Sequence, residues 1–557
     1  MYITTVPNHG SRPTVLLRES YREDGKVKNR TLANLTHWPA ERVEALARAL
    51  RGEFDNLVLG EPVCGPSFGA LFAAKQVADQ LGLSRVLGAS RRGKLALFLV
   101  LARLLCQGSR LSAVRWASQQ AVGEVLGLEP FTEDDLYRTL DELAARQARI
   151  ERALYRDYLR RHGGRPPVLV LYDVTSAYLE GRCHELGAYG YSRDGKRGKL
   201  QIVVGLLTDP AGEPLAIRVF AGNQADPTTV GEQVRILKEQ FGVEETVLVG
   251  DRGMVKLAGK EALTAAGLRY ITALTTPQVR RLLGQGTLEW SLFDEAVAEV
   301  QAEGRRYVLR RNPLVAERER RRVADKLAKL EARVEARNRF VENSERARPE
   351  VGLRRIREWI QRYGIEDWVQ VRLVGRRLVL EVDAAAREEA LALAGCYVLE
   401  TDVRGELLDA AAVDRCYRGL AVVERAFRRM KTTGLEIRPV YLRRADRTQA
   451  HALVCMLALK LQMVLEERLR AVFGTTAEDE HTVTLEDALT ALGRLCLEYY
   501  QVNGRIELTR LPQPDTQQQK ILEALGVRLP TFQPSRLKKP TQKSPRSRRR
   551  SQPRSTR

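Results

Sequence analysis

Between residues 167 and 275 the chain alternates apolar, β-branched runs with a helical pattern, and two of these runs contain an aspartate. Asp173 stands in PPVLVLYDVTSAYLEG and Asp251 in ETVLVGDRGMV, each after a stretch that is typical of a buried strand. Hairpin strands followed by a crossover helix and a further strand predict a mixed α/β sheet flanked by helices. We therefore expect each aspartate to end a strand of that sheet.

Turn and cap signals bound the elements of this segment. Asp226 is expected to cap a helix that has Pro227 at its first position. The predicted helix is 226–242, and the predicted strands are 168–179, 200–209, 214–223, 245–251 and 268–275.

A third acid, Glu424, lies in the amphipathic helical pattern YRGLAVVERAFRRMK, where Tyr417, Arg428 and Lys431 fall on the same face. Taken singly, each aspartate has the simpler explanation of a turn residue. Glu424 alone is explained by an i,i+4 pair with Arg428, worth roughly a few tenths of a kcal/mol. Taken together, two carboxylates on strand ends and one on a helix can meet at one edge of a sheet and hold Mg²⁺, which prefers hard oxygen ligands.

The charge of the chain favours a polyanionic partner. The net charge is +21, and residues 535–557 carry ten Lys and Arg and no acid, so +11 remains for the rest. Residues 531–557 are rich in Pro, Ser and Arg and are predicted to form a disordered basic tail. Because neutralising phosphates releases counterions, nucleic acid is the expected partner. No membrane partner is expected, since no basic helix has a strong opposing apolar face.

Cysteine usage and apolar runs indicate the compartment. The seven cysteines are scattered without a CxxC pair, which argues against a zinc ribbon and a disulfide scaffold. The longest apolar runs, LALFLVLA and ALVCMLAL, are about eight residues long, whereas a bilayer span takes roughly 20. We therefore expect a cytoplasmic protein.

Seven units are predicted along the chain. The second is helical, with one helix expected over 109–127, and carries Arg110, Arg115 and Arg138. It fits either a helix-turn-helix DNA reader or an ordinary bundle. The units are 1–67 (β-hairpin over 14–35 and a helix), 68–164 (helical, DNA-binding), 165–275 (catalytic core, first part), 276–395 (insertion with a helical hairpin and β strands), 396–475 (catalytic core, second part), 476–530 (C-terminal helical region) and 531–557 (basic tail).

Three segments resemble a known family, the bacterial insertion-sequence transposases with a DDE catalytic core. LYDVTSAYLEG resembles the family's first-aspartate strand, and VGDRGMV its second-aspartate strand. YRGLAVVERAFRRMK resembles its signature helix, written Tyr, two residues, Arg, three residues, Glu, six residues, Lys. Tyr417, Glu424 and Lys431 match that spacing, whereas Leu420 stands in the Arg position. Arg418 and Arg428 are close enough to replace the missing phosphate contact.

The resemblance implies a fold and a chemistry. The fold is a ribonuclease H-like mixed sheet, interrupted by a largely β insertion and preceded by a helical DNA-binding region. Asp173, Asp251 and Glu424 would hold two Mg²⁺ ions, for which Mn²⁺ substitutes, and would hydrolyse and transfer DNA strands. The residues expected to contact DNA are Tyr417, Arg428, Lys431, Arg252 and Arg418.

The resemblance also implies partners. These are the terminal inverted repeats of an element and a target DNA, bound by a homodimer or a larger assembly that acts at the bacterial nucleoid. Two alternatives are a nuclease of the same fold without strand transfer and a non-catalytic DNA-binding regulator derived from a transposase.

Overall fold

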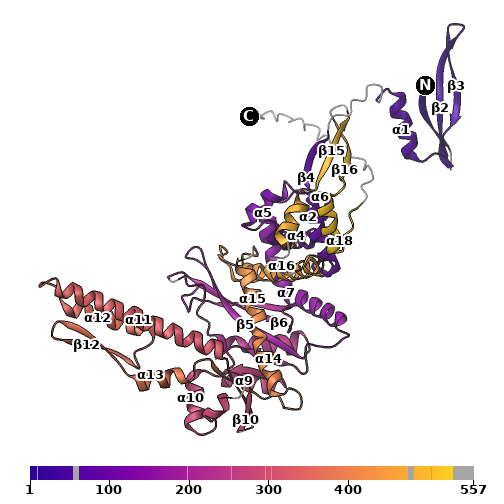
Figure 1. Ribbon diagram of the computed structural model, residues 1–557. Helices are drawn as coiled ribbons and strands as arrows, with labels where there is room; N and C mark the ends of the chain where they lie inside the picture. Colours follow the sequence, from indigo (N-terminus) through magenta and orange to yellow (C-terminus); the bar gives the residue numbers. More distant parts are fainter. Residues whose placement is uncertain are drawn as a thin grey trace, which may run out of the picture. The chain divides into compact units, whose positions relative to one another are not determined.

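The computed structural model describes residues 1–8, 11–53, 62–196, 198–252, 254–294, 297–302, 304–432, 434–474, 482–502 and 505–530. The predicted basic tail, 531–557, lies outside the described residues. The chain divides into two units, Met1–Ala73 with Ala117–Val125 and Arg468–Arg557, and Ala74–Trp116 with Leu126–Glu467. Figure 1 labels the elements of both.

The first unit opens with a three-stranded antiparallel sheet and a helix: β1 (Tyr2–Asn8), β2 (Ser11–Glu23), β3 (Lys26–Asn34) and α1 (Ala40–Leu50). The hairpin predicted over 14–35 is confirmed by the pairing of β2 with β3. Asp24 and Gly25 have φ angles of 49° and 75°, and two such residues in succession suit a tight hairpin turn.

The first unit also contains a second set of strands, one from residues 63–67 and two from residues 496–510. Its further elements are β4 (Val63–Ser67), α17 (Leu485–Gly493), β15 (Cys496–Val502), β16 (Arg505–Arg510) and α18 (Thr516–Leu525). β15 pairs with β16 on one side and with β4 on the other. The expectation of a helical region over 476–530 is therefore wrong in part. The missed signal is Asn503-Gly504 between two alternating runs, a dipeptide typical of hairpins.

Helices occupy most of residues 69–161: α2 (Gly69–Gln80), α3 (Leu83–Leu87), α4 (Arg91–Leu105), α5 (Arg110–Ala117), α6 (Val122–Leu126) and α7 (Glu133–Arg161). The single helix predicted over 109–127 is wrong. Ser67 donates its N–H to the carbonyl of Gln119 and accepts the N–H of Ala121, so the backbone there bonds to the end of β4 and leaves the helix. Arg110 is only 8% exposed, which places it inside the protein and favours a bundle over a DNA reader at that position.

The main sheet of the second unit has the strand order β10-β11-β14-β9-β8-β5-β6-β7. Its β5, β8 and β9 are parallel and its other neighbouring strands antiparallel, so the predicted mixed sheet is confirmed. The strands are β5 (Leu169–Tyr178), β6 (Gln201–Thr208), β7 (Pro214–Ala221), β8 (Val247–Gly250), β9 (Arg269–Ala273), β10 (Ala298–Ala302), β11 (Arg305–Arg311) and β14 (Cys396–Thr401).

Helical turns connect the sheet strands: η1 (Asp226–Thr229), α8 (Val230–Arg235), η2 (Ile236–Gln240), α9 (Leu257–Ala265), α10 (Thr276–Gly284) and η3 (Trp290–Asp294). The predicted cap at Asp226 is wrong, because Ala225 occupies the N-cap position and no side chain caps that end. Asp226 instead pairs with Arg193.

Asp173 does not end its strand, which corrects the first expectation. β5 continues for five residues beyond Asp173, to Tyr178, because the antiparallel strand β6 pairs with it as far as Tyr178. On its other side β5 pairs with the parallel strand β8 only as far as Tyr172. Asp173 is thus the first residue of β5 without a partner on that side. Asp251 directly follows β8, as predicted.

Gly205, in the middle of β6, gives a test of this packing. A Cβ added there would lie 3.0 Å from Cε2 of Tyr172 and closer still to its hydroxyl, and Tyr172 is fully buried. Because the ring has no room to move, Gly205→Ala should lower the free energy of unfolding by about 1–3 kcal/mol, measured by chemical denaturation. Gly231→Ala, with nothing within 4 Å of the added Cβ, should be neutral or slightly stabilising. Equal stability of the two variants would contradict the packing.

Residues 313–383 form what we call the arm, and its elements are α11 (Pro313–Glu342), α12 (Pro349–Tyr363), β12 (Val369–Val374) and β13 (Arg377–Val382), followed by α13 (Ala384–Ala392). The helices α11 and α12 pack on one another and on the β12–β13 hairpin (Figure 1). A largely β insertion is therefore the wrong expectation, since α11 and α12 have 30 and 15 residues. The arm has its own core, which includes Leu330, Val334, Ile356, Ile360 and Trp368.

The predicted signature helix is two helices, α14 (Ala410–Arg418) and α15 (Leu420–Thr432), followed by α16 (Ala445–Phe473). Gly419 between them keeps helical angles, with φ −56° and ψ −24°, so the helical direction continues across the break. By length and composition α16 is apolar enough to cross a bilayer. However, 83% of its most apolar 18-residue stretch is buried inside the protein, as in a core helix.

Candidate active site

Asp173 and Asp251 occupy equivalent places on neighbouring strands. In the parallel pair β5–β8, Tyr172 stands opposite Gly250, and each aspartate is the next residue of its strand's chain. The carboxyl ends of neighbouring parallel strands lie at one edge of a sheet, where α/β proteins commonly bind ligands. The sheet register therefore brings these two predicted residues together.

The electrostatics of Asp173 show that both other acids act on it. Burial raises the pKa of Asp173 to about 7, and the negative charges of Asp251 and Glu424 act in the same direction. The N–H of Val174, 2.7 Å from Oδ1 of Asp173, and the charge of Arg193 oppose the rise without cancelling it. The buried Asp173 carboxyl therefore has two further acids acting on it, and a bound cation would stabilise its ionised form.

Glu424 is presented by a helix whose other face is firmly anchored. Val423, Phe427 and Met430 are buried, and α15 packs against β5 and β6 (Figure 1). Glu424 itself is exposed. The apolar positions of the amphipathic pattern therefore fix the helix beside the strand that carries Asp173.

Tyr417 holds the second aspartate. Its hydroxyl donates a hydrogen bond of 3.0 Å to Oδ1 of Asp251. Burial, together with the Asp251 charge, raises the pKa of Tyr417, so the phenol stays protonated and remains a donor. In this structure Tyr417 orients a carboxylate, whereas the sequence predicts a DNA contact for it.

Lys431 is held at the other end of the same helix face. Its Nζ lies 2.6 Å from Oγ1 of Thr175 and 2.6 Å from Oδ1 of Asp194, which is 2% exposed. Arg438 also reaches Asp194, at 3.1 Å. Thr175 is two residues beyond Asp173, on the same face of β5. Lys431 therefore ties the C-terminal end of α15 to the strand that carries the first acid.

The remaining predicted residues lie close to the three acids along the chain. Arg252 is exposed, and its charge acts on Tyr417. Arg418 lies 3.0 Å from the buried carboxylate of Asp414, and Arg428 is exposed on α15. Leu420, which stands where the signature has Arg, is 7% exposed and belongs to the core, so no cation points out from that position.

The described residues contain no group of three or more His, Cys, Asp or Glu side chains placed to hold one metal ion. The arrangement is instead a pair of aspartates on adjacent strands, with Glu424 within electrostatic range. The oxygen donor set and the raised pKa of Asp173 fit a hard divalent cation.

Sequence reasoning misses Asp194 and Thr175. Asp194 lies in the loop YSRDGKRGK, where Asp-Gly signals only a turn. Thr175 stands 256 positions from Lys431, and no local pattern links the two.

Comparison with known families matches two parts of the chain. Residues 164–461 match the family model described as the transposase DDE domain, and this span includes all three acids. Residues 2–57 match the N-terminal domain of IS1634 family transposases. No curated protein matches the chain.

The solved structures that are similar to this chain include the piggyBac transposase synaptic complex with hairpin DNA. The similarity covers 72% of this chain and 69% of the piggyBac transposase chain, with 10% sequence identity and a TM-score of 0.33.

Proposed function

The chain belongs to the family of transposases with a DDE domain, and from that premise we propose that Asp173, Asp251 and Glu424 are its three catalytic acids. The chain is thus an insertion-sequence DNA transposase, an enzyme whose class depends on divalent metal. The observation that carries the proposal is the register of β5 and β8, which makes Asp173 and Asp251 neighbours inside the matched domain.

We propose that the three acids hold two Mg²⁺ ions, with Mn²⁺ as a substitute. When bound there, such a pair of ions would activate the attacking oxygen and neutralise charge on the leaving oxygen of a phosphodiester. The chain's own contribution is to hold the donors in place. Tyr417 orients Asp251, Val174 fixes one oxygen of Asp173, and Lys431 anchors the helix of Glu424.

The exposed cations beside the acids are the proposed DNA contacts. Arg252 and Arg428 are exposed on the same two segments as Asp251 and Glu424, and Arg418 has an exposed side chain despite its pair with Asp414. Guanidinium groups bind phosphate through paired N–H donors, so they suit the strand that is cut. Tyr417 and Lys431 are proposed to act first through Asp251, Thr175 and Asp194, and on DNA only when those bonds rearrange.

The wider arrangement is also proposed from the family. The core, 165–275 with 396–475, is proposed to have a ribonuclease H-like fold, and residues 68–164 are proposed to bind the element ends. Terminal inverted repeats and target DNA are the proposed substrates. A homodimer or a larger assembly would cut and paste them in the cytoplasm, where it would act at the nucleoid. The region 276–395 would be the insertion, and 476–557 would lie outside the catalytic core.

A joining assay tests the proposal. The protein is incubated with a labelled duplex bearing the DNA that flanks its coding region, together with a supercoiled target plasmid. Nicked ends and labelled target should form with Mg²⁺ or Mn²⁺ and should fall to background in EDTA. Cleavage without joining would support the nuclease alternative. DNA binding without either product would support the regulator alternative, and activity in EDTA would contradict the proposed site.

A further inference from the structure

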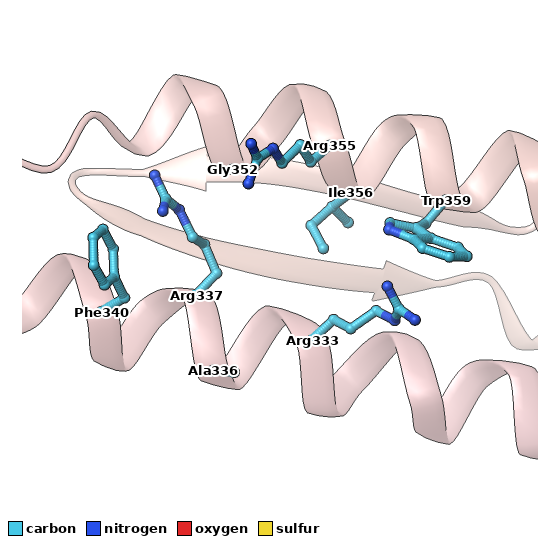
Figure 2. A pocket seen from close by; sticks show the side chains of 8 residues that line it. All are labelled: Arg333, Ala336, Arg337, Phe340, Gly352, Arg355, Ile356 and Trp359. Carbon is cyan, nitrogen blue, oxygen red and sulfur yellow. The ribbon is translucent and has the colours of Figure 1, made fainter.

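A pocket of about 330 Å³ lies between the two helices of the arm, far along the chain from the three acids. Arg333 and Arg337 come from α11 and Arg355 comes from α12, and Figure 2 shows Arg333, Arg337, Ile356 and Trp359 directed into the space between the helices. The lining contains no acidic residue. The pocket is thus lined by cations and rings.

Two of the cations are held by aromatic rings. The guanidinium carbon of Arg333 lies 3.6 Å from the ring centroid of Trp359, and that of Arg337 lies 4.9 Å from the centroid of Phe340. Stacking of this kind orients a guanidinium without neutralising its charge. A side chain ordered before binding loses less conformational entropy when it meets a ligand.

Arg337 is further fixed by a close approach of the helices. Its Nη2 donates to the carbonyl of Arg348 at 2.9 Å. Its Nε is buried and has no hydrogen-bond partner among the described residues. A Cβ on Gly352 would lie 2.8 Å from Cγ and Nε of Arg337, so this glycine leaves the room in which the guanidinium lies. The position of Arg337 therefore depends on Gly352.

The guanidinium charges in the pocket have no carboxylate partner among the described residues. Within the described part of the chain, no carboxylate lies within ion-pair distance of Arg333, Arg337 or Arg355. The nearby acid Glu335 pairs with Arg339. Over the whole arm, residues 313–383 carry eighteen Lys and Arg and thirteen Asp and Glu. An anion is the ligand that these three guanidinium groups lack.

We propose that this pocket binds the phosphodiester backbone of DNA, independently of sequence and separately from the three acids. Paired N–H donors suit phosphate oxygens, and the three cations of the pocket, two of them ordered by aromatic rings, would neutralise adjacent phosphates. The inference rests on the function given above only in that the enzyme acts on DNA. An acidic segment of a second copy is the competing occupant, and the test separates the two.

The test measures binding of the full chain to a labelled duplex of random sequence, in EDTA, by fluorescence anisotropy across a salt series. The triple variant Arg333→Gln, Arg337→Gln, Arg355→Gln should weaken binding by about tenfold or more at 0.1 M salt. It should also lower the slope of log affinity against log salt by about two to three, since each phosphate contact contributes roughly 0.9. Because no metal is present, failure here is independent of the catalytic acids.

Two matched variants distinguish binding in the pocket from attraction of DNA by the overall positive charge of the arm. Arg318→Gln, Arg320→Gln, Arg321→Gln removes the same charge from exposed positions of α11, and it should lose several times less affinity. Gly352→Ala keeps every charge but displaces Arg337, and it should weaken binding by about threefold or more, consistent with the loss of one phosphate contact. Equal losses in the two triple variants, or an unchanged salt slope, would overturn the proposal. If the triple variant of the pocket changes the sedimentation of the protein and leaves its DNA affinity unchanged, the proposal is also overturned. The occupant of the pocket would then be an acidic segment of a second copy of the chain.

Discussion

Glu424→Gln is expected to abolish both nicking and joining of element ends while the protein stays folded and keeps its affinity for DNA. Glutamine preserves the size of the side chain but removes the charge that a divalent cation requires. Loss of a residue that only supports a metal ligand typically costs roughly 10–100-fold, so loss of the ligand should cost at least about 1,000-fold. Glu424 is exposed, so the free energy of unfolding should change by less than about 0.5 kcal/mol. Product formation per unit time on a labelled end measures the effect.

The matched control is Glu406→Gln. Glu406 is also exposed, precedes α14, and loses the same charge on substitution. Its activity should remain within about twofold of the unchanged enzyme, as for ordinary surface positions. If Glu424→Gln cleaves as fast as Glu406→Gln, then Glu424 is not one of the catalytic acids. A Glu424→Gln protein that no longer binds DNA would assign the residue to substrate binding.

The alternation of apolar strands and helices was enough to predict the mixed sheet and the position of Asp251. A strand that ends in Gly-Asp-Arg-Gly carries its own stop signal in the glycines. No glycine follows Asp173 in this way, and β5 continues beyond it to Tyr178. The length of β5 is set by β6, whose pairing extends to Tyr178, beyond the point where β8 has ended. Strand length in this case depends on a partner, which no window of local sequence contains.

Helical periodicity predicts that Tyr417, Glu424 and Lys431 share one face, but it does not predict which residues Tyr417 and Lys431 contact. Tyr417 reaches Asp251 across 166 positions, and Lys431 reaches Asp194 across 237. Both residue types are common phosphate contacts, so the sequence favoured DNA as their partner. The fold supplies internal acceptors for both. The sequence therefore did not predict the internal hydrogen bonds of Tyr417 and Lys431.

In the arm, too, the local sequence does not show which side chains contact another element. Leu330 and Val334 lie four positions apart on α11, and both are buried in the arm's core. The pattern ERERRRVADKLAKLEARVEARNRFVE is rich in arginine throughout, and periodicity alone cannot tell which arginines face a second helix. That distinction depends on Gly352, which lies on α12 and admits Arg337 between the helices. The sequence of an arginine-rich helix therefore does not show which arginines line a pocket, because that depends on how the helix packs against its neighbour.

Lys431→Met should destabilise the protein by about 3 kcal/mol and slow strand cleavage through the loss of an internal ion pair. The Lys431 side chain is 11% exposed and that of Asp194 is 2% exposed, so the pair is buried. Removing one partner of a buried pair costs roughly 3–5 kcal/mol, because the other charge is left behind. The lower end of that range applies, since Arg438 still lies 3.1 Å from Asp194. Chemical denaturation measures the loss.

Arg425→Met is the control, because Arg425 is exposed on the same helix and loses the same charge. It should change the free energy of unfolding by less than about 0.5 kcal/mol. The double variant Asp194→Asn, Lys431→Met should be less destabilised than the sum of the single variants, because neither charge then remains without its partner. If Lys431→Met is as stable as Arg425→Met and instead lowers the salt slope of DNA binding by about one, Lys431 contacts phosphate and the ion pair is secondary. Destabilisation with an unchanged salt slope would instead assign Lys431 to holding the helix of Glu424 against β5.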